Sequence, residues 1–316
     1  MTADATPTAV VFPGQGTQKQ GMGGPWQDCG SWPLVKEISE HVGTDLEELL
    51  LNADDEALRR TDRAQLAVFT VGVLAFHEAV AAGVLKTVAG YAGHSLGEYV
   101  AMHAAGALEL GDAARLVAAR GRAMRDAAEE RPGAMGALIK ADEETAESLT
   151  ADARAAGHDV WVANLNSPGQ AVVSGTADGI GHVADAAAVH GARLVRLPVG
   201  GAFHSPMMSA AATRLAGALA SVPFADVHAP VAANVDGRLR TGAEAHWPEL
   251  EMRQLTGPVL WERGVRSLHG ELGCRRFLEL GRGRTLSGMI TRILPESTTA
   301  SAGSPEELRA LTSVRT

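Results

Sequence analysis

The sequence Tyr91-Ala92-Gly93-His94-Ser95-Leu96-Gly97-Glu98-Tyr99 sets a G-x-S-x-G pattern between a short apolar run and a helix-like segment. Here the pattern predicts a strand-to-helix turn, because flanking glycines let the backbone turn sharply and expose the serine hydroxyl. Ser95 is therefore the candidate nucleophile. The backbone N–H of Leu96 is a candidate oxyanion donor, a contribution of roughly 2.7–4 kcal/mol. The alternative is a glycine-bounded helix cap in which Ser95 bonds its own backbone.

Strands and helices alternate on both sides of this turn. An apolar strand over residues 9–12 ends at Pro13-Gly14-Gln15-Gly16, and such alternation is typical of a mainly parallel sheet. Helices are predicted over residues 34–41, 64–82, 113–127, 209–220 and 262–268. Further strands are expected near Val231 and over residues 277–280, and the last dozen residues are expected to form a peripheral tail.

A different pattern occupies residues 133–198. Strands are predicted over 137–139, 160–163, 171–173 and 193–197, and helices over 143–156 and 179–189. The order βαββαβ is that of the ferredoxin-like split unit. The sequence thus predicts an α/β fold: a large domain with a mainly parallel sheet, residues 1–132 and 199–316, interrupted by a ferredoxin-like small domain of residues 133–198.

Composition narrows the class of protein. With 316 residues and 46% apolar content, the chain can bury a large core. The net charge of −9 argues against nucleic acid as a partner. Neither a leader sequence nor an uninterrupted apolar run of about 18 residues is seen, so we expect a cytoplasmic monomer that does not bind membranes. Cys29 and Cys274 are too far apart in sequence to predict a disulfide framework or a zinc site.

One basic segment stands out from this acidic background. Between Arg253 and Arg292 there are eight arginines and three glutamates, a local balance of +5. Such a segment is usually a solvated helical face, and it is alternatively a docking surface for an acidic partner.

Five stretches, in this order, carry a family resemblance. They are Phe12-Pro13-Gly14-Gln15-Gly16-Thr17-Gln18, Gly93-His94-Ser95-Leu96-Gly97-Glu98-Tyr99, Leu116-Val117-Ala118-Ala119-Arg120-Gly121-Arg122-Ala123-Met124, Asn166-Ser167-Pro168-Gly169-Gln170 and Gly201-Ala202-Phe203-His204-Ser205. Together they resemble the malonyl-CoA:acyl-carrier-protein transacylases and the acyltransferase domains of polyketide synthases, over roughly residues 9 to 292. The fold of that family is a hydrolase-like α/β domain interrupted by a ferredoxin-like one, which agrees with the insertion predicted above.

The resemblance implies which histidine is the catalytic base. Spacing alone does not choose among eleven histidines, although His94 should point away from the elbow and His103 lies within the following helix. By resemblance, His204 removes the proton of Ser95 and returns it to the leaving thiol. The family orients this histidine by a backbone carbonyl, here that of Gln254. Asp236 is the rival third member, and we favour a turn role for it.

The resemblance also implies how the acyl group is bound. Gln15 matches the second oxyanion donor through its backbone N–H, and Gln65 matches a pocket residue, although Leu66 stands where the family usually has proline. Arg120 lies in an apolar helix, where a buried charge needs a partner. The matching arginine in the family binds the free carboxylate of a malonyl group with two N–H donors.

Two further residues are expected to shape the acyl pocket. Phe203 resembles the form of its motif that is associated with malonyl rather than methylmalonyl groups. Met124 is expected to line the same pocket, with core packing as the alternative.

The expected reaction is transfer of a malonyl unit from CoA to the phosphopantetheine thiol of an acyl carrier protein through a malonyl-serine ester, without metal or redox cofactor. It would serve fatty acid or polyketide biosynthesis. Gly281-Arg282-Gly283, where the family usually has Gly-Pro-Gly, and Gly200-Gly201-Ala202-Phe203 favour a discrete polyketide role. The alternatives are a thioester hydrolase, an acyltransferase for a different or larger acyl unit, and a carrier-binding module without activity.

Overall fold

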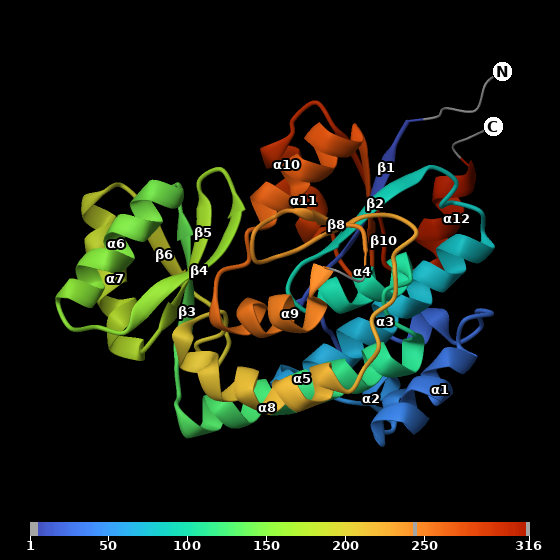
Figure 1. The fold of residues 1–316 in the computed structure, drawn as a ribbon, viewed down its shortest axis with the longest axis horizontal. Coiled ribbons are helices and arrows are strands. Elements are labelled where there is room, and N and C mark those ends of the chain that lie inside the picture. Colours follow the sequence, from blue (N-terminus) through green and yellow to red (C-terminus); the bar gives the residue numbers. More distant parts are fainter. Residues whose placement is uncertain (1–5, 243–244, 314–316) are drawn as a thin grey trace.

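The computed structural model describes residues 6–242 and 245–313, which form two sheets with their helices. The larger domain lies on the right in Figure 1 and the smaller on the left, with α5 (Leu110–Glu130) and α8 (Ser209–Ala220) along the lower edge. This arrangement confirms the predicted fold class: a mainly parallel α/β domain with an inserted ferredoxin-like unit. The boundaries at 132/133 and 198/199 stay a prediction.

The large sheet has the strand order β10-β9-β1-β2-β7-β8 in the described residues, and each neighbouring pair is parallel except β7 and β8. Its strands are β1 (Thr8–Phe12), β2 (Val88–Gly93), β7 (Val231–Ala232), β8 (Leu239–Arg240), β9 (Arg276–Leu280) and β10 (Thr298–Ala302). In an open parallel sheet, ligands bind beyond the carboxyl ends of the strands. The turn after β2 carries Ser95, so the candidate nucleophile lies at that edge.

Alternating side chains of the central strand β1 face two layers of helices. Val10 and Phe12 belong to one core cluster, which includes residues of α3 (Thr61–Ala81) and α5. Ala9 and Val11 belong to a second cluster, which includes residues of α10 (Trp261–Leu272) and α11 (Thr285–Ile293). Because helices cover both faces of the sheet at this strand, residues 9–12 are all apolar, and polar and apolar residues do not alternate along it. The helices of this domain, besides α5 and α8, are α1 (Pro33–Val42), α2 (Leu46–Leu51), α3 (Thr61–Ala81), α4 (Gly97–Ala105), α9 (Trp247–Thr256), α10 (Trp261–Leu272), α11 (Thr285–Ile293) and α12 (Pro305–Ser313).

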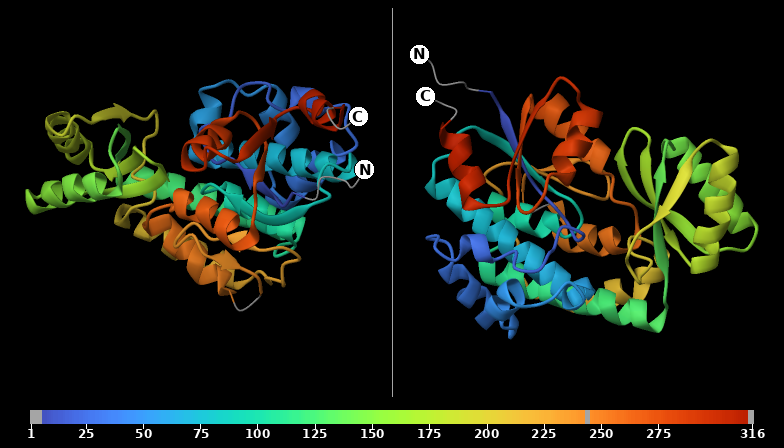
Figure 2. Two further views of the ribbon diagram at one scale, coloured as in Figure 1. Left: turned by 90° about the horizontal axis from the view of Figure 1, so that it is seen from above. Right: turned by 180° about the vertical axis from the view of Figure 1, so that it is seen from behind.

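The small domain is an antiparallel sheet with two helices on one face. Its sheet has the order β4-β5-β3-β6, and the elements follow the chain as βαββαβ. They are β3 (Ala134–Ile139), α6 (Glu143–Ala155), β4 (Val160–Ser167), β5 (Gln170–Gly175), α7 (Ala177–Val189) and β6 (Arg193–Arg196). Figure 2 shows from behind how α5 leads directly into β3.

The chain enters and leaves the small domain at one place. The N–H of Gly133 donates to the carbonyl of Gly200 over 3.3 Å, and a Cβ on Gly133 would lie 2.6 Å from the Cβ of Ala202. The entering and returning segments therefore run side by side in close contact.

The last dozen residues, 305–316, are predicted to form a peripheral tail. In the structure residues 305–313 form the helix α12, whose Leu308 is buried, and residues 314–316 lie outside the described part of the chain. The strand β10, which the sequence did not predict, precedes this segment and pairs with β9.

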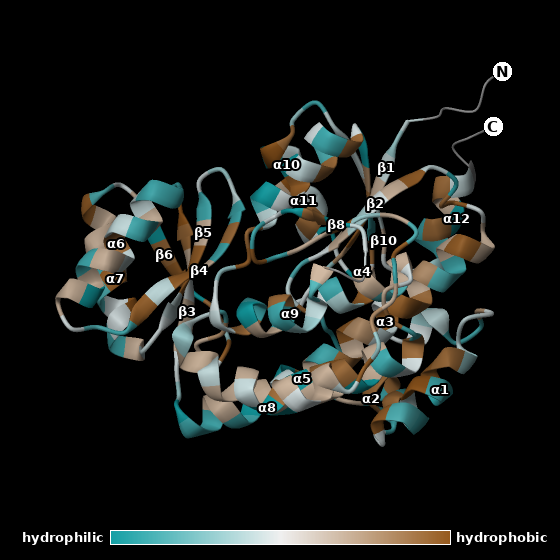
Figure 3. Ribbon diagram, in the orientation of Figure 1, coloured by the Kyte–Doolittle hydropathy of each residue, from teal (hydrophilic) through white to brown (hydrophobic). Residues whose placement is uncertain are grey.

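The helix α3 is the one helix of the described residues with the length and composition that a membrane span requires, and 78% of its apolar window is buried inside the protein. Figure 3 shows this apolar character along α3, at the centre of the large domain. A core helix of a globular domain has the same properties.

Candidate active site

The turn after β2 holds Ser95 in a left-handed conformation with φ of 53°. A Cβ on Gly93 would lie 1.9 Å from the carbonyl of Gly97, and a Cβ on Gly97 would lie 2.2 Å from the carbonyl oxygen of Phe12. Both glycines are therefore required by close backbone contacts. The strained backbone at Ser95 is typical of a nucleophile elbow and costs on the order of 1–3 kcal/mol.

The hydroxyl of Ser95 is bound to a histidine that follows the small domain in sequence. Ser95 Oγ lies 2.7 Å from His204 Nε2, and His204 Nδ1 lies 2.7 Å from the carbonyl oxygen of Gln254. Since a carbonyl only accepts, Nδ1 carries the proton and Nε2 is free to accept the proton of Ser95. Burial, and secondly the charge of Arg120, lower the pKa of His204 to about 3, so the imidazole is neutral at neutral pH.

Arg120 is 1% exposed and its guanidinium reaches the nucleophile. Its terminal nitrogen Nη1 donates to Gln65 Oε1 over 2.8 Å. The other donates to Gln254 Oε1 over 2.8 Å and to Ser95 Oγ over 3.0 Å. These acceptors are neutral oxygens, so the charge of Arg120 is hydrogen-bonded beside the serine but is not neutralised by them.

Gln65 lies behind Arg120 rather than on the cavity wall. Its amide oxygen accepts from Arg120, and its amide nitrogen lies 3.2 Å from the sulfur of Met124. Met124 and Phe203 do line the cavity. A Cβ on Gly201 would lie 2.5 Å from the ring of Phe203, so only glycine at that position leaves room for the ring where it is.

The two candidate oxyanion donors follow neighbouring strands. Phe12 on β1 is paired in register with Gly93 on β2, so the loops after these residues lie together. Among the residues that the structure describes, the N–H groups of Gln15 and Leu96 have no protein acceptor. Unpaired backbone donors at the edge of a cavity are free to bind a developing negative charge.

Asn234 supports the elbow, and the sequence did not single it out for this role. Its side-chain oxygen accepts from the N–H of Ser95 over 2.7 Å, and its side-chain nitrogen donates to the carbonyl of Gly93 over 2.7 Å. Its own N–H donates to Glu98 Oε1 over 3.0 Å. The available signal was its position as a polar residue two positions after the end of β7, at the edge of the sheet that carries Ser95.

The remaining sequence candidates lie elsewhere. His94 Nε2 is 2.9 Å from Asn166 Oδ1, across the cavity in the small domain, and does not bond Ser95. His103 is paired with His77 and with the carbonyl of Leu108. Asp236 accepts from the N–H of Arg238 and pairs with Arg240, as expected of a turn residue.

The cavity at this site has a volume of about 630 Å³ and lies between the two domains. The small domain contributes a wall of three polar and five apolar residues, namely Asn164, Asn166, Gln170, Met135, Ala137, Val172, Leu197 and Pro198. The large domain contributes the residues described above, with the basic side chains of Lys19, Arg59 and Arg282 among the lining. Of the eight arginines between Arg253 and Arg292, all within the described residues, only Arg282 is among those that line this cavity.

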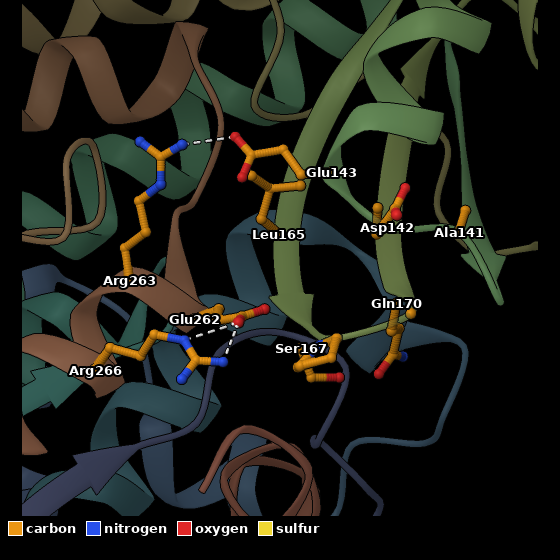
Figure 4. A pocket seen from close by; sticks show the side chains of 12 residues that line it. Ala141, Asp142, Glu143, Leu165, Ser167, Gln170, Glu262, Arg263 and Arg266 are labelled. Carbon is orange, nitrogen blue, oxygen red and sulfur yellow. Dashed lines mark hydrogen bonds and ion pairs between the residues drawn. The ribbon is translucent and has the colours of Figure 1, made fainter.

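A second cavity of about 370 Å³ lies between the small domain and α10 (Figure 4). Arg263 reaches across it to Glu143 over 2.6 Å, whereas Arg266 pairs with Glu262 on its own helix. Arg292 bonds Ser167 and Gln170 at the β4–β5 turn. Much of the basic segment therefore binds groups within this chain, which reduces the surface left for a docking partner.

The chain matches the model of the acyl transferase domain over residues 9–282. It belongs to the acyl transferase domain family. This confirms the resemblance drawn from the five sequence stretches. The malonyl CoA-acyl carrier protein transacylase of Bacillus subtilis is 36% identical over 303 residues, which cover 95% of this chain and 94% of that protein. The polyketide biosynthesis protein ThaF of Burkholderia thailandensis is 37% identical over 93% of this chain, which spans 25% of that longer protein.

Solved structures of acyl transferases are similar over nearly the whole chain. The malonyl-CoA:acyl carrier protein transacylase of Xanthomonas oryzae has a TM-score of 0.91 and 36% identity, covering 99% of both chains. A malonyl-transacylase in complex with a type II polyketide acyl-carrier protein has a TM-score of 0.92 and 33% identity, covering 98% of this chain and 100% of that one.

Proposed function

We propose that this acyl transferase moves a malonyl group from CoA to the phosphopantetheine thiol of an acyl carrier protein, in fatty acid or polyketide biosynthesis. The observation that carries the proposal is the buried guanidinium of Arg120, 3.0 Å from Ser95 Oγ. A thioester whose acyl group ends in a carboxylate supplies the anion that this cation needs. The similar proteins whose names include malonyl-CoA transacylase activity support the same substrate.

In the first half-reaction Ser95 Oγ attacks the thioester carbonyl carbon while its proton passes to His204 Nε2. The N–H groups of Gln15 and Leu96 bind the oxyanion of the tetrahedral intermediate. The carbon–sulfur bond then breaks, and His204 returns the proton to the sulfur of CoA. The second half-reaction runs these steps in reverse with the carrier thiol as the nucleophile.

Met124 and Phe203 limit the volume beside the acyl chain, and Gln65 holds Arg120 in place for the carboxylate. We further propose that the enzyme acts as a cytoplasmic monomer and that neither a metal nor a redox cofactor takes part in these steps. The wall that the small domain contributes to this cavity would contact the pantetheine arm of either thioester.

The test is a panel of acyl-CoA thioesters incubated with the protein and read by intact mass. Malonyl-CoA should add one malonyl group to the wild type and none to Ser95→Ala. Transfer is then measured as malonyl-carrier formed against free malonate released. Faster release of malonate than transfer would favour a thioester hydrolase, and preferential labelling by a larger acyl-CoA would contradict the malonyl assignment.

A further inference from the structure

Four lysine and arginine side chains of the described residues line the active-site cavity, and the proposed reaction uses one of them. Arg120 is 1% exposed and lies beside Ser95, whereas Arg282 is half-buried and Lys19 and Arg59 are exposed. An exposed side chain that also lines a cavity lies at its opening. Burial therefore places Arg120 inside the cavity and the other three, which we call the rim cations, at its mouth.

Arg282 makes the first of the contacts that bring the rim cations together. Its Nη1 donates to the carbonyl of Thr17 over 3.3 Å, in the segment that follows β1. A Cβ on Gly281 would lie 2.9 Å from the ring of Pro13 in that segment, so the two loops are in close contact. Lys19 is two residues after Thr17, and the Cα atoms of such residues lie at most about 7 Å apart. Arg282 and Lys19 therefore belong to one side of the mouth.

Arg59 reaches the same side from a short segment that precedes α3. The N–H of Gln20, the residue after Lys19, donates to Asp55 Oδ1 over 3.1 Å. Arg59 follows four residues after Asp55, at the end of the short 3₁₀ helix Ala57–Arg59. Three segments that are far apart in sequence thus each present one positive charge at one opening.

The charges of the rim cations are not neutralised by neighbouring acids. Within the described residues none of the three takes part in an ion pair, and Asp55 is the single acid that lines the cavity. The lining therefore carries four cations and one acid, a balance of +3, in a chain whose net charge is −9. Charge of one sign around a cavity focuses the electric field and raises the local concentration of ligands of the opposite sign.

The thioesters of the proposed reaction carry an anion at the matching place. CoA and the carrier both present pantetheine, which has the thiol at one end and a phosphate ester at the other. When the thioester carbonyl lies at Ser95, the arm leads out of the cavity and its phosphate reaches the mouth. Guanidinium and ammonium groups are the side chains with which proteins bind phosphate. Because the rim cations line the cavity itself, they favour a group on the arm over the protein surface of a carrier.

We propose that Lys19, Arg59 and Arg282 form a binding site for the phosphate ester that ends the pantetheine arm. The inference rests on the proposed function, because it takes the arm to enter with its thioester at Ser95. The site accepts the same phosphate from CoA and from a carrier protein, so it serves both half-reactions. It makes the enzyme selective for phosphorylated thioesters over pantetheine thioesters that lack a phosphate.

The experiment compares three malonyl donors that differ in their phosphates: malonyl-pantetheine, malonyl-phosphopantetheine and malonyl-CoA. Single-turnover acylation of Ser95, read by intact mass, gives the half-saturating concentration of each donor. We expect similar values for the two phosphorylated donors, about tenfold lower than for malonyl-pantetheine. Added salt should raise the values of the phosphorylated donors more than that of malonyl-pantetheine, because exposed charges are screened.

Substitution of the rim cations should remove this preference. Arg282→Gln and Arg59→Gln should each raise the half-saturating concentration of the phosphorylated donors by about two- to fivefold, and the triple variant with Lys19→Gln by about tenfold or more. Malonyl-pantetheine should keep its wild-type value in every variant. The maximal acylation rate should not change, because the rim cations do not contact the reacting atoms.

Each arginine of the rim has a matched control beside it in the sequence. Arg284 donates to Ser301 and Arg60 pairs with Asp62, and neither lines the cavity. Arg284→Gln and Arg60→Gln should therefore use all three donors as the wild type does. A rise for the phosphorylated donors in these controls equal to that in the rim variants would overturn the site, since it would reflect the overall charge of the surface.

The second half-reaction separates the two sources of the phosphate. Malonyl-enzyme is offered pantetheine, phosphopantetheine or a holo acyl carrier protein as the acceptor thiol. The triple variant should weaken the use of phosphopantetheine and of the carrier by a similar factor and leave pantetheine unchanged. A loss confined to malonyl-CoA would assign the rim cations to the other phosphates of CoA, and a loss confined to the carrier would assign them to its protein surface. Both results would overturn the inference.

The wild type alone also tests the inference. Equal half-saturating concentrations of malonyl-pantetheine and malonyl-phosphopantetheine would overturn it without any variant. Equal weakening of both donors in the triple variant would overturn it as well, because the substitutions would then act on the shape of the cavity. Failure of malonyl-CoA to label the wild type would instead contradict the proposed function.

Discussion

The two walls of the active-site cavity are built in different ways. On the side of the large domain, Ser95, His204 and Arg120 belong to one hydrogen-bonded network that also contains Gln254. On the side of the small domain, Asn166 bonds His94, and within the described residues the other lining side chains form no hydrogen bond to Ser95, His204 or Arg120. The difference indicates that the reacting atoms are fixed within one domain, while the small domain shapes the space around the substrate. Mutations on the two walls should therefore differ in the size and in the kind of their effect.

The largest effect is expected at the base. His204→Ala removes the proton acceptor of Ser95 and should lower the rate of acylation by malonyl-CoA by about 10²–10⁴-fold. The measurement is single-turnover acylation followed by intact mass. His103→Ala, on the helix after the elbow, is the control and should keep a near wild-type rate. A fall in the acylation rate of less than tenfold in His204→Ala would contradict the assignment of His204 as the base.

The next effect is expected at Arg120, where it should depend on the substrate. Arg120→Ala leaves the malonyl carboxylate without its buried partner, a penalty of roughly 3–5 kcal/mol, so malonyl transfer should fall by about 200- to 5,000-fold. Acetyl transfer should fall far less. Arg115→Ala, an exposed arginine of the same helix, is the matched control. Equal losses for both acyl groups would show that Arg120 supports the fold rather than the specificity.

Loss of the Asn234 side chain, which supports the elbow, should have an intermediate effect on the acylation rate. Asn234→Ala leaves the N–H of Ser95 and the carbonyl of Gly93 without partners, which costs about 1–3 kcal/mol. We expect the acylation rate to fall by about 10–100-fold and the melting temperature to fall as well. Calorimetry together with acylation kinetics measures both. An unchanged rate would mean that the glycines alone hold the elbow in shape.

The small-domain wall should give a weaker effect of a different kind. Asn166→Ala removes the hydrogen-bond partner of His94 at the cavity wall, so the loss should be about 0.5–1.5 kcal/mol. We expect up to a tenfold rise in KM with kcat unchanged. Steady-state kinetics separates these two constants. A fall in kcat as large as that of Asn234→Ala would contradict the division between the two walls.

The smallest effect is expected outside the cavity. Arg263→Gln removes an exposed ion pair between the domains, which is worth about 0–1 kcal/mol, so stability and transfer should stay close to wild type (Figure 4). Arg266→Gln, which removes a pair within α10, is the control. A loss of transfer in Arg263→Gln alone would show that the domains must be held together at this cavity for activity.

Much of the fold could be predicted from the sequence because its signals are local. The glycines around Ser95 predict a sharp turn from residues that are adjacent in sequence. The helix predicted over 209–220 has the same limits in the structure. The strand β10 and helix α12 were missed, since their stability comes from pairing with β9 and packing on α3 rather than from an apolar pattern of their own.

The site was predictable to a lesser degree. The resemblance brought Gln254 to attention for its carbonyl, but its side chain also bonds Arg120 and Glu98. Asn234 was missed, because a single polar residue gives no pattern and its role depends on a segment more than a hundred residues away. Gln65 was expected on the cavity wall and lies behind Arg120, a distinction that depends on the orientation of the side chain.

The close contact between Gly133 and Ala202 constrains any exchange of small domains between related enzymes. Both covalent connections pass through this contact, and the returning one continues within a few residues to Phe203 and His204. A chimera whose second junction lies after Ala202 would bring a foreign residue against Gly133 and shift the imidazole. Junctions placed at residues 133 and 199 would keep the returning segment native, and with it the alignment of the catalytic pair.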